Sequence, residues 1–168
     1  MSAFTLSACS KTAEPTDTPP SSTTTTEPTI PETTVPVSTN STATPAAPAA
    51  PAADNTDTIS GVKYASYTGD ADKGKIAFLT CQTCHSIDAG VNKIGPSLHA
   101  VVGREAGTIA GFSYSTANKD SGITWTPEKL FQYLEAPQRV VPGTKMTFAG
   151  FSDPQKRADV IAYLKSNS

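Results

Sequence analysis

The chain has 168 residues, three cysteines and a formal net charge of −2 at neutral pH, so it has room for one domain or two small ones. No apolar run approaches the ~18 residues that a membrane-spanning helix needs. There is no long run of Lys and Arg and no alternation of basic and aromatic residues, and the composition therefore argues against nucleic-acid binding.

The chain starts with the segment MSAFTLSAC, residues 1–9. Its last four residues, Leu-Ser-Ala-Cys, resemble the lipobox of bacterial lipoproteins, in which the cysteine is lipidated after cleavage. The segment is shorter than a complete signal peptide and has no basic first region. We interpret residues 1–9 as a truncated signal segment and expect Cys9 to be a lipid anchor.

Residues 10–58 have the composition of a linker. Fifteen Thr and nine Pro fill 24 of the 49 positions, and the segment has no Gly, no aromatic residue and no Leu. Such a segment cannot bury enough apolar surface to offset the entropy that it loses on ordering. We therefore predict a disordered linker, partly in the polyproline II conformation. It would span about 40 Å as a flexible coil and about 150 Å when fully extended.

Residues 59–168 are predicted to form the folded domain. All eleven glycines and eleven of the twelve aromatic residues lie in this part, and its twelve Lys and Arg against nine acidic residues give it a charge of +3. A mildly basic domain favours acidic protein partners. About 110 residues are enough for one compact domain with a thin core.

The first predicted helix starts near Asp70 and runs through the motif CQTCH at residues 81–85. Acidic residues near its start suit a helix N-terminus. We expect Ile76, Phe78 and Leu79 to face the core.

Two more helices are predicted towards the C-terminus. The earlier one has Thr126 as its cap and Pro127 at its first position, and we expect it to end at Pro137. The last helix starts with Ser152 and Gln155, which have capping-box spacing. Its apolar residues recur at helical spacing at Ala158, Ile161 and Leu164.

Long loops are expected between these helices. Residues 86–124 and 137–151 are rich in Gly and turn residues and show no sustained alternation, with at most a short helix near 115–119. The prediction is an all-α domain whose loops are unusually long. Loops of this length need something to pack on.

The motif CQTCH places Cys81 and Cys84 one helical turn apart, with His85 directly after them. A thioredoxin-like dithiol needs a βαβ setting, and no strand pattern surrounds the motif. A structural zinc site needs four ligands, and only His99 remains within the predicted domain. A disulfide between the two thiols leaves the adjacent histidine without a role. C-x-x-C-H is instead the attachment motif of a c-type haem, which would also provide a core for the long loops.

The haem iron would need a second axial ligand, for which there are two candidates. Met146 lies in the loop PGTKMTFAG, whose Pro and Gly allow a side chain to reach the far haem face. His99 follows closely on the loop after His85, so we expect it to stay on the same side as His85. The only other methionine is Met1. We predict His85 and Met146 as the iron ligands.

From Gly69 to Lys165 the chain resembles a class I cytochrome c of the mitochondrial and related bacterial type. The resemblance rests on segments in family order and near-family spacing: GDADKGKIAF, CQTCH, GPSLHAVVGREAG, FSYSTANKDSGITW, YLEAPQRVVPGTKMTFAG and ADVIAYLKS. It implies a class I cytochrome c fold, all-α, with about three main helices and long loops around one covalent haem.

The resemblance also implies roles for individual residues. Gly74 and Phe78 match a first-helix pair that the last helix crosses closely, with Val160 and Tyr163 opposite. Pro96 would accept the ring proton of the proximal histidine through its carbonyl group. The remaining haem-binding residues are the expected propionate donors Arg104, Tyr114 and Trp125, the polar cluster Asn118, Tyr133 and Thr144 near the methionine, and Phe148 at the haem edge.

His/Met ligation leaves no open position on iron, and a soft thioether ligand favours Fe(II). The expected function is therefore one-electron transfer between membrane complexes, such as a cytochrome bc complex and a terminal oxidase or photosynthetic reaction centre. The alternative is an enzyme, either a peroxidase or the haem subunit of a periplasmic dehydrogenase. Haem attachment of this kind implies export, so we expect a periplasmic domain anchored to a membrane through Cys9. Nothing indicates a stable oligomer, and a monomer is expected.

Overall fold

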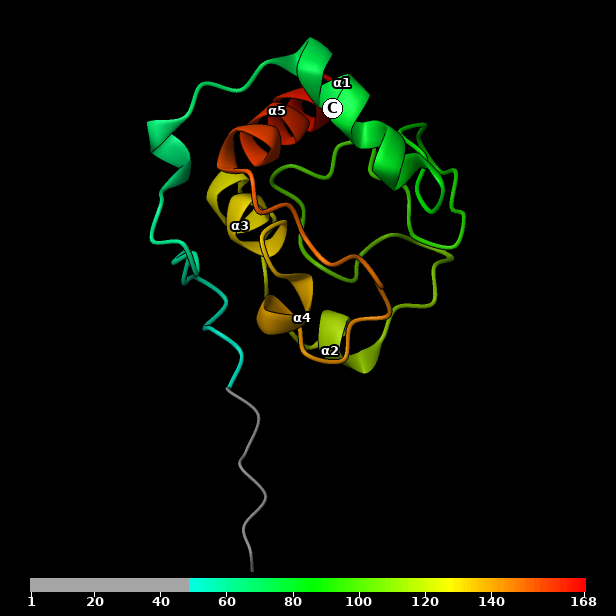
Figure 1. The fold of residues 1–168 in the computed structure, drawn as a ribbon. Coiled ribbons are helices and arrows are strands. Elements are labelled where there is room, and N and C mark those ends of the chain that lie inside the picture. Colours follow the sequence, from blue (N-terminus) through cyan, green and yellow to red (C-terminus); the bar gives the residue numbers. More distant parts are fainter. Residues whose placement is uncertain (1–48) are drawn as a thin grey trace, which may run out of the picture. The chain divides into compact units, whose positions relative to one another are not determined.

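The structure, a computed structural model, describes residues 49–168. Cys9 and most of the predicted linker lie outside these residues. The described part folds into helices joined by long loops and contains no β-strand, only an isolated antiparallel bridge between Glu105 and Thr124. None of its helices is both long and apolar enough to cross a membrane. The elements in chain order are η1 (Tyr64–Ser66), α1 (Ala71–Gln82), α2 (Thr116–Lys119), α3 (Pro127–Tyr133), α4 (Pro137–Val140) and α5 (Pro154–Lys165), as Figure 1 shows.

Two long helices, α1 and α5, cross at close range and confirm the predicted all-α architecture (Figure 1). At the crossing, a Cβ on Gly74 would overlap the main-chain oxygen of Asp159. The ring of Phe78 packs on Tyr163 with 5.2 Å between the ring centroids. Only glycine fits at position 74 because the backbone of α5 occupies the space that a side chain would need.

The inward face of α1 differs from the prediction. Asp70 caps the helix by accepting hydrogen bonds from the main-chain N–H groups of the first turn. Phe78 is buried, but Ile76 is 70% exposed and Leu79 is 59% exposed. The prediction that these two side chains face the core was wrong. The crossing with α5 turns Gly74, Ala77 and Phe78 inward, and positions 76 and 79 then lie on the other side of the helix.

The start of α3 is as predicted, because Thr126 caps it by accepting from the N–H of Lys129 and Pro127 occupies its first position. The prediction that this helix ends at Pro137 was wrong. Helix α3 stops at Tyr133, and Pro137 begins the short helix α4. A proline needs no N–H partner at the first helical position, so the residue expected to end one helix starts the next.

Helix α5 buries the predicted apolar residues, since Ala158 and Ile161 are 0% exposed and Leu164 is 3% exposed. Its cap is Asp153, which accepts from the N–H groups of Gln155 and Lys156. The predicted capping box of Ser152 and Gln155 was therefore wrong, because the cap lies one residue later and Pro154 takes the first helical position. The short helix predicted near 115–119 is present as α2.

Residues 51–60, here called the strap, lie along α3 (Figure 1, cyan). Lys129 is only 1% exposed, and its Nζ donates to the main-chain oxygens of Ala52 at 3.1 Å and Asn55 at 2.7 Å. The buried Gln132 donates to the side-chain oxygen of Asn55 and the main-chain oxygen of Asp57, both at 2.9 Å. The composition of residues 51–58, which contain no Gly, aromatic residue or Leu, predicts a linker. Their contacts with α3 are mainly hydrogen bonds to the main chain, which leave no trace in an apolar pattern.

The strap ends at a buried ion pair between α5 and the segment after α3. Arg157 is 0% exposed and forms an ion pair with Glu135, with 2.9 Å between Nη1 and Oε1. Its Cζ lies 4.4 Å from the centroid of the Phe131 ring. Glu135 also accepts from the main-chain N–H of Ser60 at 3.2 Å and from its hydroxyl at 2.6 Å. Burial acts to raise the pKa of Glu135, but the hydrogen bonds from Ser60 and Arg157 outweigh it and the pKa lies below its usual value.

We expect Glu135→Gln to lower the free energy of unfolding by about 1–3 kcal/mol at neutral pH, because the substitution removes the charge that partners Arg157. A carboxylate with a lowered native pKa stabilises the fold above its unfolded pKa, and this contribution is lost as the pH falls through the native pKa. The difference between variant and wild type should therefore shrink near pH ~3. Denaturant unfolding at neutral pH and near pH ~3 measures this difference in the free energy of unfolding. Glu105→Gln, at an exposed position, is the control, and equal losses in the two variants at neutral pH would contradict the assignment.

Candidate cofactor site

One cavity collects the candidate residues of the described part. Its volume is about 410 Å³, within the usual range of small-molecule and cofactor sites. The end of α1, the loops on either side of α2, helix α3 and the segment after α4 all contribute to its wall. Every predicted haem-site residue within the described part lines it: Cys81, Cys84, His85, Pro96, Arg104, Tyr114, Asn118, Trp125, Tyr133, Thr144, Met146 and Phe148.

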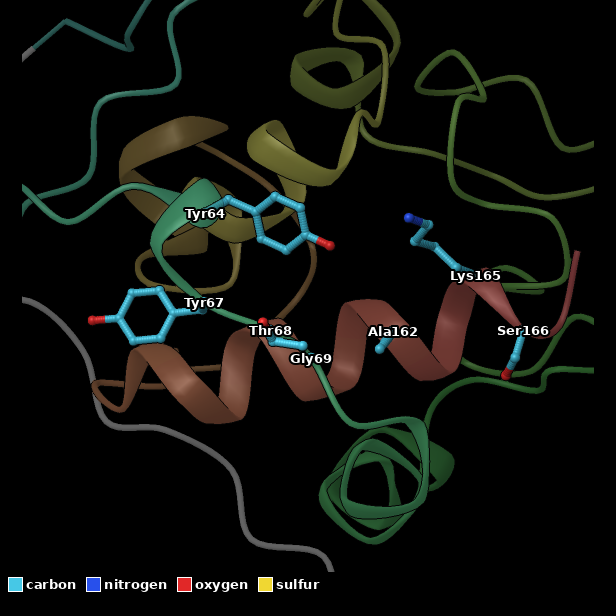
Figure 2. A pocket seen from close by; sticks show the side chains of 7 residues that line it. All are labelled: Tyr64, Tyr67, Thr68, Gly69, Ala162, Lys165 and Ser166. Carbon is cyan, nitrogen blue, oxygen red and sulfur yellow. The ribbon is translucent and has the colours of Figure 1, made fainter.

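A second, more open hollow lies between the segment before α1 and the C-terminal end of α5. Figure 2 shows its lining, with Tyr64 and Tyr67 on one side, Ala162 and Lys165 on α5, and Ser166 directly after α5. No cysteine, histidine or methionine lines it. It offers no thiol for covalent attachment and no iron ligand, so the first cavity is the candidate site.

The two cysteines of the motif lie where α1 ends. The N–H groups of Cys84 and His85 both donate to the main-chain oxygen of Cys81, at 3.1 Å and 2.9 Å, so the chain turns at the cavity wall. Both cysteines are free thiols. Burial, with the neighbouring Cys84 adding to it, raises the pKa of the Cys81 thiol to about 11. Redox dithiols have lowered pKa values, so the environment of Cys81 argues against a thioredoxin-like pair.

The imidazole of His85 is held by short-range contacts. Its Nδ1 lies 2.8 Å from the main-chain oxygen of Pro96. Burial lowers the pKa of His85, against the opposing effect of the Pro96 hydrogen bond, so the ring is neutral at neutral pH. With the proton on Nδ1 directed to the carbonyl, the lone pair of Nε2 is free to bind a metal.

Gly95 is a site residue that sequence reasoning missed. A Cβ at this position would overlap Cε1 of His85 and lie 2.7 Å from its Nδ1. The ring of His85 therefore rests directly on the backbone of Gly95. Nothing in the sequence distinguishes this glycine from the other ten.

Polar groups surround Met146 at the same cavity. The hydroxyl of Tyr133 lies 3.8 Å from Sδ of Met146, and the main-chain N–H of Met146 donates to Oγ1 of Thr144 at 3.3 Å. Burial raises the pKa of Tyr133, so its hydroxyl remains a donor at neutral pH. Oδ1 of Asn118 is buried without a partner among the protein atoms, which fits a cavity that takes a polar cofactor.

Arg104, Tyr114 and Trp125 lie together in the cavity wall. The guanidinium of Arg104 donates to the main-chain oxygens of His99 at 2.7 Å and Ser97 at 3.1 Å. The Trp125 ring is 7% exposed and packs against Tyr133 with 4.7 Å between centroids. His99, the other candidate iron ligand, is not part of the cavity lining and contributes its main-chain oxygen to Arg104.

Within residues 49–168 no group of three or more His, Cys, Asp or Glu side chains is placed to hold a metal ion. The zinc interpretation of the motif therefore has no support in the described part. The combination of two free thiols, a neutral histidine and a thioether around one cavity fits a covalently attached haem.

Comparison with known proteins agrees with this geometry. The family description "Cytochrome c" matches residues 71–168. Cytochrome c2 of Rhodopila globiformis is 57% identical over 99 residues, which cover 58% of this chain and 93% of that protein. Cytochrome c2 of Blastochloris viridis is 54% identical over 97 residues, 57% of this chain and 76% of that protein. The structure of cytochrome cH from Methylobacterium extorquens matches with a TM-score of 0.56 and 48% identity, over 58% of this chain and 99% of that one.

Gly95→Ala is expected to reduce covalent haem incorporation sharply, because the added methyl group would displace the His85 ring from Pro96. The measurement is the haem-to-protein absorbance ratio of the purified protein. Gly90→Ala is the control, since a Cβ there meets nothing within 4 Å, although its φ of +72° adds a backbone cost of about 1–2 kcal/mol. Equal haem contents in the two variants would contradict the steric role.

Proposed function

We propose that this protein, which belongs to the cytochrome c family, is an electron carrier tethered to a membrane. Members of the family carry a covalent c-type haem, whose iron takes up and releases one electron. The chain is accordingly an electron-transfer protein and not an enzyme. Its all-α fold and its CxxCH motif at Cys81, Cys84 and His85 agree with that membership.

We assign the haem contacts to the residues around the 410 Å³ cavity. Cys81 and Cys84 would form the two thioether bonds, and Nε2 of His85 and Sδ of Met146 would bind the iron. The observation that carries this assignment is that His85 and Met146 line one cavity, each with a polar partner, while His99 does not. The Pro96 carbonyl orients the His85 ring and increases its basicity as a ligand.

The other wall residues have roles that follow from their chemistry. Haem carboxylates need hydrogen-bond donors when they are buried, and Arg104, Tyr114 and Trp125 supply donors at the cavity wall. Burial lowers the pKa of Arg104, yet a guanidinium stays charged at neutral pH. Tyr133 and Thr144 hold the methionine, while Phe148 covers the wall with an aromatic ring packed on Phe151.

The tether is proposed from the sequence before the strap. Cys9 in its lipobox-like setting would carry the lipid, and the Thr- and Pro-rich segment from residue 10 to about residue 50 would link it to the folded part. A tether of this kind raises the effective concentration of the carrier at membrane complexes. We propose a periplasmic, monomeric carrier that exchanges electrons with a cytochrome bc complex and with a terminal oxidase or reaction centre.

The ligand assignment is tested by Met146→Ala. We expect this variant to lose the high reduction potential that a thioether ligand confers and to bind cyanide at the iron position it opens. Redox titration and cyanide titration of the oxidised protein measure both. His99→Ala is the control and should match wild type, because His99 does not line the cavity. Wild-type potential and wild-type cyanide affinity in Met146→Ala would refute the assignment.

The tether is tested by Cys9→Ala in the full-length protein. We expect the wild type to partition into the detergent phase of a two-phase extraction and the variant to stay in the aqueous phase, because the lipid is the only membrane anchor proposed. Haem content should be the same in both proteins. Aqueous behaviour of the wild type would count against lipidation.

A further inference from the structure

We propose that the strap, residues 51–60, is a positioning element that holds the Met146 side of the cavity closed from outside. This inference rests on the proposed function, because it takes Met146 as the iron ligand. The strap precedes the family match, which begins at residue 71, so it is an addition of this chain to the family domain.

The strap is held by buried polar groups of α3 and by the Glu135–Arg157 pair. Lys129 on α3 is a buried ammonium, and its acceptors are two strap carbonyls and Oε1 of Gln132. A buried charge without acceptors is strongly unfavourable. Glu135 and Arg157 hold the other end of the strap at Ser60. The strap therefore completes the packing of α3 rather than lying loosely on its surface.

One route from the strap to Met146 runs through α4. Arg139 donates to the main-chain oxygen of Asp57 at 3.0 Å. The preceding residue, Gln138, donates to the main-chain oxygens of Met146 at 3.0 Å and Thr144 at 3.3 Å. Two adjacent side chains of one short helix thus connect the strap with the main chain of the methionine loop at Thr144 and Met146. Pro137 and Val140 bury the other face of α4, which limits how far the helix can move.

A second route runs through α3. Lys129 and Gln132 contact the strap, and the residues that directly follow them, Leu130 and Tyr133, line the cavity. The hydroxyl of Tyr133 then reaches Sδ of Met146. Because strap-facing and cavity-facing residues alternate on the same helical turns, a shift of α3 on its strap side moves the tyrosine that touches the methionine.

The His85 side has no comparable connection. Its supports are Pro96 and Gly95, and among the described residues no hydrogen bond joins the strap to residues 81–104. Loosening the strap should therefore affect one axial ligand and spare the other. An effect on Met146 alone would distinguish a positioning role of the strap from a general contribution of the strap to stability.

The test uses full-length holoprotein with Lys129→Met and Arg139→Met, and Lys75→Met as control. The first two substitutions each remove a cationic group that donates to the strap, and the control removes one from an exposed position on α1. Cyanide is the probe, because it competes with Met146 for the oxidised iron. We expect at least about tenfold tighter cyanide binding in Lys129→Met, a smaller increase in Arg139→Met and none in Lys75→Met, since a hydrogen bond to a charged group is lost in the first two.

Amide hydrogen exchange on the same samples supplies the second readout. Exchange should become faster in residues 51–60 and 144–148 and stay at the wild-type rate in residues 95–104. Arg139→Met keeps the test decisive if Lys129→Met does not fold, because its side chain is not part of the buried Lys129 site.

The outcomes separate the two proposals. If wild type binds cyanide as tightly as Met146→Ala, the ligand assignment in the proposed function fails. If wild type binds cyanide weakly and both strap variants match Lys75→Met, the ligand assignment stands and the positioning role is overturned. Faster exchange on both sides of the cavity, or unchanged exchange in the strap, also overturns it.

Discussion

The close crossing of α1 and α5 at Gly74 is the constraint on which the site depends. Because the backbone of α5 occupies the space beside Gly74, α1 can lie in only one orientation, with Ala77 and Phe78 inward. Cys81 follows on the same side of the helix, one turn later, and reaches the cavity wall. The thiols and His85 are thus placed by helix packing some ten residues away from them.

The two sides of the cavity are built by different means. His85 is held within a short stretch of chain, by Pro96 and by the bare backbone of Gly95. Met146 is held by groups from two helices, because Tyr133 comes from α3 and the loop itself is supported by Gln138 on α4. A side chain held within one loop responds little to changes elsewhere, whereas one held by several elements responds to each of them. Because of this asymmetry, we expect the strap to affect Met146 and not His85.

The strap shows how a polar segment can become part of a fold. Its side chains bury little apolar surface, yet α3 presents a buried lysine and a buried glutamine whose hydrogen-bonding groups need partners. Main-chain carbonyl groups of the strap accept three of these hydrogen bonds, and the side chain of Asn55 accepts a fourth. The strap therefore has a defined place beside α3.

The sequence by itself determined the all-α class, the helices around Asp70, Pro127 and Pro154, and the Cys81, Cys84 and His85 part of the cavity wall, because capping residues, helical spacing and the CxxCH motif are local signals. The family resemblance supplied most of the other predicted wall residues. It did not determine which way α1 faces: Ile76 and Leu79 are as apolar as Phe78, and only contact with α5 decides between them. Nor did it single out Gly95, Lys129 or residues 51–58, whose roles depend on what another segment places beside them. Local pattern decides where elements form and which chemistry they carry. Tertiary structure decides which neighbours each residue meets, because those neighbours are brought from distant parts of the chain.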